Sequence, residues 1–209
     1  MADNELPRWI EWAREIQALG QTGITYSDND YHTQRYQRLT EIATEILDSH
    51  TTLSNQQIHA QLTMQAGYAT PKVDVRGAVV RDSKILLVQE KVDGLWCMPG
   101  GWADVGDYPS EMVVREVWEE SGFHVKPVKV IGVYDANRSG TPLEFFHAYK
   151  LVFLCKIVGG QPRPSYETLA VDFFPFDRLP ALSSSRTNER HLAEVLAHVR
   201  EPDRPAAFD

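Results

Sequence analysis

The sequence predicts an α+β fold, in which a helical N-terminal region is followed by a mixed sheet between helical layers. Apolar residues recur at helical spacing through residues 1–69. From Pro71 onward the chain changes to short runs of alternating or β-branched residues separated by turns, with two helical segments among and after them. We therefore divide the chain into a helical domain at 1–69 and a second domain at 70–209.

The composition describes a folded, acidic protein. Among 209 residues, 29 acidic and 21 basic side chains give a net charge of −8, and 43% of the residues are hydrophobic. This content supports a buried core, and the acidic balance argues against a nucleic-acid binder with a basic face. No apolar run approaches the ~18 residues of a membrane span, and no secretory leader is visible. We expect a soluble cytoplasmic protein in which Cys97 and Cys155 are buried reduced thiols.

Three short amphipathic helices are predicted in the N-terminal region. The first has an apolar face followed by two glycines that are expected to end it: Trp9, Trp12, Ile16 and Leu19, then Gly20 and Gly23. The second is expected to begin at a cap from Asp28 or Asp30 and to bury one face: Tyr36, Leu39, Ile42, Ala43, Ile46 and Leu47. The third begins at Ser54, with Gln57 as its capping-box partner. Because such helices bury little alone, they should pack on the rest of the chain or on a second copy.

The second domain is predicted to contain at least five strands and a C-terminal helix. Residues 73–76 alternate in polarity, and residues 78–80 and 85–88 form a hairpin across the polar turn 81–84. The remaining strands and the helix are expected at 128–134, 145–157, 171–176 and 192–199. Gly159-Gly160, Pro162 and Pro164 mark an exposed loop between the last two strands.

A further helix in this domain carries a crowded acidic face. Residues 101–123 hold six carboxylates and one basic side chain, Arg115. Pro109 suits the first helical position and Gly122 the end. Glu116, Glu119 and Glu120 stand at i, i+3 and i+4, so they share a face and repel one another. Two interpretations stay open here: a hydrated acidic face, or a face neutralised by hard cations such as Mg²⁺ or Mn²⁺, which prefer oxygen ligands.

The loop before this helix favours the metal interpretation. Pro99-Gly100-Gly101-Trp102 places two glycines where the backbone must approach a neighbour closely. The carbonyl of Gly100 could then serve as one more oxygen ligand. We expect the glutamate face to be surface-exposed, so that Glu120→Gln slows turnover and leaves the fold intact.

Together these residues resemble the box of the Nudix hydrolase family, G-x5-E-x7-R-E-u-x-E-E-x-G-u. The matching residues keep every interval: Gly101, Asp107, Arg115-Glu116-Val117, Glu119-Glu120 and Gly122-Phe123. Asp107 departs from the pattern because it replaces a glutamate, although a shorter carboxylate can still pair with Arg115 or bind metal through water. The resemblance implies a Nudix α/β/α sandwich and metal-dependent attack of water on a pyrophosphate.

The resemblance also implies roles for individual residues. Glu116, Glu119, Glu120 and the carbonyl of Gly100 would hold Mg²⁺ or Mn²⁺, and Arg115 would orient Glu116. The general base, or an extra metal ligand, would be Glu167, which lies six residues before Phe173 on a loop before a late strand. A solvated loop glutamate remains an equal alternative for Glu167, and Glu144 is a weaker candidate for the base.

Substrate contacts are less constrained by spacing. Trp102 is a candidate for stacking on a base or ribose, with a structural role as the alternative. Arg76 and Arg138 are candidates for binding phosphates, with an ordinary surface arginine as the alternative for each. Tyr134 with Asp135 ends a strand near the expected cleft. Trp96 is expected in the core.

Residues 21–26, 67–77 and 99–106 resemble a bacterial Nudix subgroup that has an added helical N-terminal domain. That subgroup includes CDP-choline and ADP-ribose pyrophosphatases, and its added domain is associated with a homodimer. The resemblance implies hydrolysis of a nucleoside diphosphate linked to X, with CDP-choline slightly ahead of ADP-ribose. The alternatives are a pyrophosphohydrolase of RNA 5′ ends or nucleoside triphosphates, and a Nudix module that binds a nucleotide without cleaving it.

Overall fold

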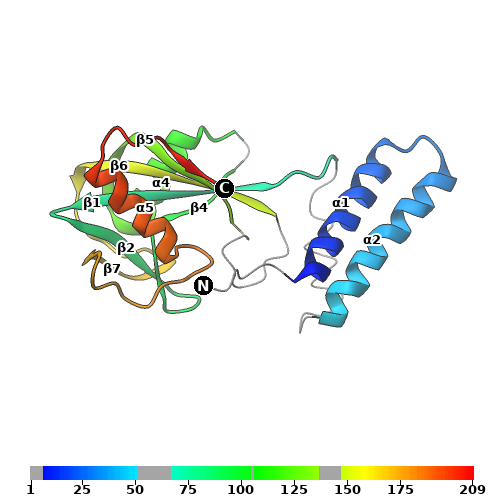
Figure 1. Ribbon diagram of the computed structural model, residues 1–209, viewed down its shortest axis with the longest axis horizontal. Coiled ribbons are helices and arrows are strands. Elements are labelled where there is room, and N and C mark those ends of the chain that lie inside the picture. Colours follow the sequence, from blue (N-terminus) through cyan, green and yellow to red (C-terminus); the bar gives the residue numbers. More distant parts are fainter. Residues whose placement is uncertain (1–6, 51–66, 105, 137–146) are drawn as a thin grey trace. The chain divides into compact units, whose positions relative to one another are not determined.

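The computed structural model describes residues 7–50, 67–104, 106–136 and 147–209 (Figure 1). These residues form two compact units that divide between Pro71 and Lys72. The first unit contains helices α1 and α2, and the second contains the sheet with helices α4 and α5. The helix expected at Ser54, together with Arg138 and Glu144, lies outside the described residues.

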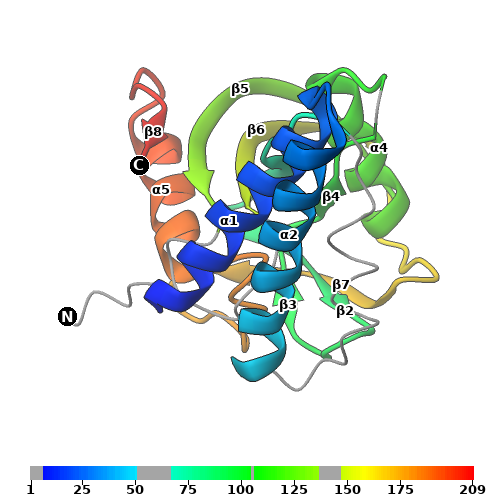
Figure 2. The ribbon, with the colours of Figure 1, turned by 90° about the vertical axis from the view of Figure 1, so that its right-hand side faces the viewer.

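Helices α1 (Arg8–Tyr26) and α2 (Asp30–His50) form an antiparallel hairpin (Figures 1 and 2). The prediction that Gly20 and Gly23 end the first helix is wrong, because α1 continues through both. A Cβ at Gly20 would lie 2.7 Å from the Thr40 methyl, and one at Gly23 would lie 2.2 Å from the Tyr36 ring. The two glycines therefore let α2 pack closely against α1.

Two further details of the hairpin differ from expectation. Asn29, and not Asp28 or Asp30, caps α2, since its Oδ1 accepts the N–H of His32 at 2.9 Å. The buried face of α1 is formed by Ile10, Ala13 and Gly20, with Ala43 and Leu47 buried on α2. Trp12 and Leu19, expected on the inward face, are more than half exposed.

The second unit is built on one mixed, eight-stranded sheet. Its strands are β1 (Lys72–Arg81), β2 (Lys84–Glu90), β3 (Trp96–Cys97), β4 (Gly100–Trp102), β5 (Phe123–Asp135), β6 (Ala148–Gly160), β7 (Thr168–Pro175) and β8 (Ala207–Phe208). The main path runs β3-β2-β1-β6-β5-β8, while β4 pairs with β1 and β7 with β2. The β1–β6 and β5–β8 pairs are parallel and the others antiparallel.

The strand predictions are largely confirmed, including the hairpin between β1 and β2. Its turn uses Asp82 and Ser83, which both have positive φ angles, 50° and 58°, as a tight two-residue turn requires. The sequence does not predict two of the short strands. Gly100–Trp102, expected as a loop, pairs with β1, and Ala207–Phe208 adds an edge strand beside β5.

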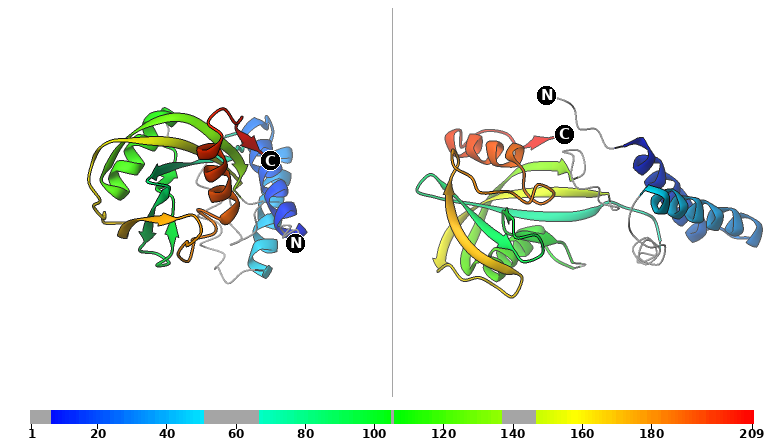
Figure 3. Two further views of the ribbon diagram at one scale, coloured as in Figure 1. Left: turned by 60° about the vertical axis from the view of Figure 1, so that its left-hand side comes forward. Right: turned by 90° about the horizontal axis from the view of Figure 1, so that it is seen from below.

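Two helices cover opposite faces of the sheet (Figure 3). Helix α4 (Pro109–Ser121) packs its apolar side on one core, which includes Val75, Val79 and Phe153. Helix α5 (Glu189–Arg200) packs on a second core, which includes Ala78 and Val152. This arrangement is the expected α/β/α sandwich preceded by a helical region. Both cysteines are buried and reduced, as predicted, and no helix among the described residues is long and apolar enough to cross a membrane.

Candidate active site

Helix α4 presents the acidic face as the sequence predicts. It starts with Pro109 in its first turn and ends at Gly122, whose φ of 77° is left-handed and whose N–H donates to Trp118 O at 2.8 Å. Val113 and Val117 are fully buried and seat the helix on the sheet. A Cβ at Gly77 of β1 would lie 2.4 Å from the Val117 side chain, so helix and strand approach closely here.

The Gly100–Gly101 turn brings backbone atoms up to the carboxylates of α4. Gly100 has a φ of 146°, and a Cβ there would lie 1.9 Å from Val75 O, so only glycine fits. Its N–H donates to Glu120 Oε2 at 2.9 Å. A Cβ at Gly101 would lie 3.2 Å from Glu116 Oε2. The close approach that the two glycines predict is therefore made to the glutamates themselves.

The three glutamates differ in exposure, which corrects the expectation of a uniformly exposed face. Glu120 is 6% exposed, whereas the side chains of Glu116 and Glu119 are 12% and 47% exposed. Burial raises the pKa of Glu120 to about 8, and it also raises the pKa of Glu116. A buried carboxylate with so little compensation is a place where a cation would bind favourably.

Arg115 supplies a positively charged side chain to the acidic cluster. Its guanidinium lies 2.7 Å from Asp107 Oδ2, 3.0 Å from Glu116 Oε1 and 3.5 Å from Glu119 Oε2. The expectation that an aspartate at 107 can still pair with Arg115 is confirmed. The expected pairing of Arg115 with Glu116 is also present, and it fixes one orientation of that carboxylate.

The donor set has the chemistry of a hard divalent cation site. It offers carboxylates of Glu116, Glu119 and Glu120 together with the carbonyl of Gly100, all of them oxygen ligands. Across the described ranges, no three His, Cys, Asp or Glu side chains are already gathered around one point. Glu116 and Glu119 instead pair with Arg115, so a cation would compete with this guanidinium for them.

Glu167 lies on a loop that is fastened to α4. Thr168 Oγ1 donates to Glu120 O at 3.1 Å, and the Glu167 N–H donates to Ser165 Oγ at 3.0 Å. On its other side, the carbonyl of Glu167 accepts the N–H of Lys91 at 3.0 Å. The Glu167 side chain is exposed, and its charge contributes to raising the pKa of Glu116. The loop thus holds Glu167 beside the acidic cluster.

The residues expected to contact the substrate differ in their exposure. Trp102 is 47% exposed, and the Lys72 ammonium lies over its ring, 5.8 Å from the centroid, so stacking on the exposed part of the ring stays a prediction. Tyr134 is only 3% exposed and packs against His191 in the core beneath α5, a position that does not support substrate contact. Trp96 packs on Phe174, as expected of a core residue.

Arg76 is buried, which does not support the expected contact with substrate phosphates. It is 5% exposed and bonds Asp74 through Nη2 at 2.9 Å and Nε at 3.2 Å. Lys150 Nζ lies 2.7 Å from the same carboxylate. Asp74 and Lys150 are functional candidates that the sequence reasoning missed. Asp74 has a signal in the sequence, because it stands two residues from Arg76 and alternation places both charges on one face of the strand.

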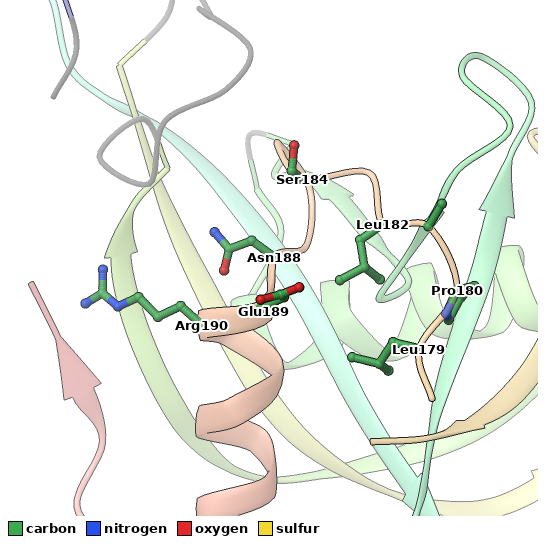
Figure 4. Close-up of a pocket in the computed structure, with 8 residues that line it drawn as sticks. Leu179, Pro180, Leu182, Ser184, Asn188, Glu189 and Arg190 are labelled. Atoms are coloured by element: carbon green, nitrogen blue, oxygen red, sulfur yellow. The ribbon is translucent and has the colours of Figure 1, made fainter. Parts of the chain in front are cut away.

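A pocket of about 550 Å³ lies at the N-terminal end of α5 (Figure 4). Leu179, Pro180 and Leu182 line one side of it, and Asn188 and Arg190 come from the start of the helix. None of the predicted site residues lines this pocket. It is therefore separate from the acidic site on α4, which covers the opposite face of the sheet (Figure 3).

The fold and this site define a Nudix hydrolase. Residues 71–197 match the family profile of the NUDIX domain, so the chain belongs to the Nudix family. Residues 7–62 match a second profile, described as a UDP-X-like, N-terminal oligomerisation domain. The predicted resemblance to the bacterial subgroup with a helical N-terminal domain is thereby confirmed.

Three known proteins illustrate the similarity. A Bacillus subtilis (strain 168) protein named putative ADP-ribose pyrophosphatase YjhB is 38% identical over 202 residues, which are 97% of this chain and 97% of that protein. A solved UDP-X diphosphatase is 32% identical, with a TM-score of 0.62, over 97% of this chain and 98% of that one. A solved ADP-ribose pyrophosphatase from Streptococcus suis 89-1591 is 38% identical, with a TM-score of 0.60, over 67% of this chain and 100% of that one.

Proposed function

We propose that this Nudix hydrolase is a divalent-metal-dependent pyrophosphatase that cleaves a nucleoside diphosphate linked to X into a nucleoside monophosphate and X-phosphate. The observation that carries the proposal is the buried carboxylate of Glu120. Its Oε2 accepts the N–H of Gly100 at 2.9 Å, and its pKa is raised to about 8 because burial outweighs the stabilisation of the ionised form by Arg76 and by this N–H. A divalent cation would stabilise the ionised form further and displace the proton.

The mechanism assigns a task to each residue. A bound Mg²⁺ or Mn²⁺ would supply neutralisation of the pyrophosphate oxygens and activation of water. Glu116, Glu119, Glu120 and the Gly100 carbonyl would hold the cation, and Arg115 would orient Glu116 from 3.0 Å. Glu167 would accept the proton of the attacking water. The new bond joins the water oxygen to phosphorus, the bridging P–O bond breaks, and its oxygen leaves with X-phosphate or with the nucleoside monophosphate.

The names of the relatives support a nucleoside diphosphate-X substrate without naming X for this chain. Two relatives are called ADP-ribose pyrophosphatases and one a UDP-X diphosphatase. ADP-ribose and compounds that carry a UDP group therefore join CDP-choline as substrates to test, and we place ADP-ribose first. The exposed face of Trp102, 47% accessible, is the proposed platform for the base or ribose.

A substrate panel tests this function. ADP-ribose, UDP-glucose, CDP-choline, a nucleoside triphosphate and a 5′-triphosphorylated RNA would each be incubated with Mg²⁺, Mn²⁺ or EDTA, and the products identified by mass. We expect a nucleoside monophosphate from at least one NDP-X compound, and only with metal. Cleavage confined to the triphosphates would favour the RNA or nucleotide pyrophosphohydrolase instead. Nucleotide-induced stabilisation without any cleavage would favour the binding module.

We also propose that the helical domain at 1–69 joins two copies of the chain into a homodimer. The matching profile is described as an oligomerisation domain. On α1, Trp12 is 53% and Leu19 58% exposed, which leaves apolar surface for a second copy to cover. Light scattering should find a dimer for the wild type and for the Glu15→Gln control on the same helix, and a monomer for Trp12→Glu with Leu19→Glu. A stable dimer of the double variant would contradict the proposal.

A further inference from the structure

We infer that Arg76 and Thr187 are positioning residues that clamp the backbone of Met98 and thereby fix the Gly100–Gly101 turn for metal binding. The inference rests on the proposed function of that turn. Met98 is fully buried immediately before Pro99-Gly100-Gly101, and both of its backbone polar groups are bound by side chains from distant parts of the chain. Neither residue belongs to the Nudix box.

The two hydrogen bonds of the clamp come from different elements of the fold. Arg76 Nη1, on β1, donates to the Met98 carbonyl at 3.2 Å. The Met98 N–H donates to Thr187 Oγ1 at 2.9 Å, and Thr187 lies just before α5. Arg76 is 5% and Thr187 0% exposed, so water cannot readily replace either partner, and losing one would leave a buried peptide group unsatisfied.

The clamp is continuous with the glutamates through the next two residues. The Pro99 carbonyl accepts the Gly77 N–H at 2.8 Å, and the Gly100 N–H donates to Glu120 Oε2 at 2.9 Å. In the β1–β4 pairing, Gly100 lies opposite Arg76. Residues 98 to 100 are therefore held by β1, by the segment before α5 and by α4. A shift of Met98 would be passed to the Gly100 turn and to its bond with Glu120, because only Pro99 separates Met98 from Gly100.

Arg76 and Thr187 are also tied to each other by a buried ion cluster. Asp74 binds Arg76 at 2.9 Å and Lys150 Nζ at 2.7 Å. Lys150 in turn donates to the carbonyls of Ser185 at 3.0 Å and Arg186 at 2.8 Å, directly before Thr187. These polar contacts, together with the chain link from Arg186 to Thr187, form a closed ring that passes through Met98. The ring thereby fixes the position of the Met98 backbone. It also accounts for the burial of Arg76, whose charge is paired with Asp74 inside the fold.

The test compares shape-matched variants by equilibrium Mn²⁺ binding, measured as the loss of the free Mn²⁺ signal in electron paramagnetic resonance. Thr187→Val keeps the shape and removes the hydroxyl, whereas Thr187→Ser keeps the hydroxyl. We expect Thr187→Val to weaken Mn²⁺ binding about tenfold or more, as the loss of an outer-shell contact does in metal sites, and Thr187→Ser to restore most of it. Arg76→Met should weaken binding similarly, with partial rescue by Arg76→Lys.

Kinetics with ADP-ribose separate positioning from substrate contact. At saturating Mn²⁺ the variants should lower kcat and leave KM unchanged, since neither side chain reaches the substrate. Val195→Ala, a change on the buried side of α5, controls for lost stability and should leave Mn²⁺ binding as in the wild type. Equal Mn²⁺ binding by Thr187→Val and Thr187→Ser would overturn the inference, as would a raised KM with unchanged Mn²⁺ binding in Arg76→Lys. If the wild type binds Mn²⁺ but cleaves no NDP-X, the proposed function fails while the binding comparison still decides the clamp.

Discussion

Replacing Glu120 with glutamine should abolish metal-dependent turnover while stabilising the metal-free protein. Glutamine keeps an oxygen that can accept the Gly100 N–H, now made to Glu120 Oε2 at 2.9 Å, but it removes the charge. We expect kcat to fall roughly 1,000-fold, which corresponds to about 4 kcal/mol of transition-state stabilisation by the cation. A residue of a hydrated acidic face would show no such loss.

The stability change follows from the burial of Glu120. Its pKa is raised from 4.5 to about 8 in the fold, so at pH 7 the unfolded chain ionises this carboxyl and the folded chain does not. The resulting cost to the free energy of unfolding is about 3 kcal/mol at pH 7. Because the folded pKa is the higher one, the stabilising contribution is complete below pH 4.5 and is lost as the pH rises toward 8. Glutamine does not titrate and escapes this loss.

Urea unfolding in EDTA and with Mn²⁺ measures both effects. In EDTA, Glu120→Gln should be more stable than the wild type at pH 7, and the difference should vanish near pH 4.5. With Mn²⁺, only the wild type should gain stability. Glu111→Gln, an exposed position in the first turn of the same helix, should behave as the wild type in every assay. Near-normal turnover of Glu120→Gln, or a loss of its stability in EDTA, would refute the metal-site reasoning.

Three further predictions concern single positions. Burial lowers the pKa of His191 to about 3, so the unfolded chain takes up the proton first, and His191 alone should lower the free energy of unfolding by about 2 kcal/mol between pH 7 and pH 5, opposite in sign to the contribution of Glu120. His191→Gln, which can keep the capping box with Asn188, should lack that part of the loss in urea titrations. Gly100→Ala should yield little folded protein by circular dichroism, because its Cβ would lie 1.9 Å from Val75 O. Normal folding and activity of that variant would show that the turn is not constrained. Asp107→Asn should reduce kcat less than tenfold, since its 2.7 Å pair with Arg115 is partly exposed, whereas a 100-fold loss would make Asp107 a metal ligand.

The fold class can be predicted from the periodicity of apolar residues, because the apolar side of a helix packs against the sheet. Val113 and Val117, four residues apart, are both fully buried against the sheet. One error comes from glycine, because the structural role of a glycine depends on its neighbours in space. Gly20 and Gly23 resemble a helix stop in the sequence, but they lie where α2 crosses α1 closely. Such contacts depend on the partner helix, which local sequence does not specify.

The acidic face of α4 can be predicted from the sequence, because its chemistry depends on a fixed spacing of the glutamates. Glu116 and Glu120, four residues apart, stand beside the Gly100–Gly101 turn as the motif implies. The burial of Glu120 cannot be predicted from the sequence, because it depends on the turn that covers this side chain in the fold. The buried ion cluster of Asp74 and Lys150 joins residues 76 positions apart in the chain, and the parallel β1–β6 pairing that brings them together has no local signature.

The most direct test of the central claim is the anomalous scattering of Mn²⁺ in crystals of the protein soaked with that ion. If the acidic face of α4 holds the metal, a peak should lie within about 2.5 Å of carboxylate oxygens of Glu116 and Glu120 and of the Gly100 carbonyl. Glu116 should then leave its 3.0 Å pair with Arg115 or share it with the ion. A Mn²⁺ peak elsewhere, with Glu116 still paired with Arg115 and Glu120 with Gly100, would rule out this metal site.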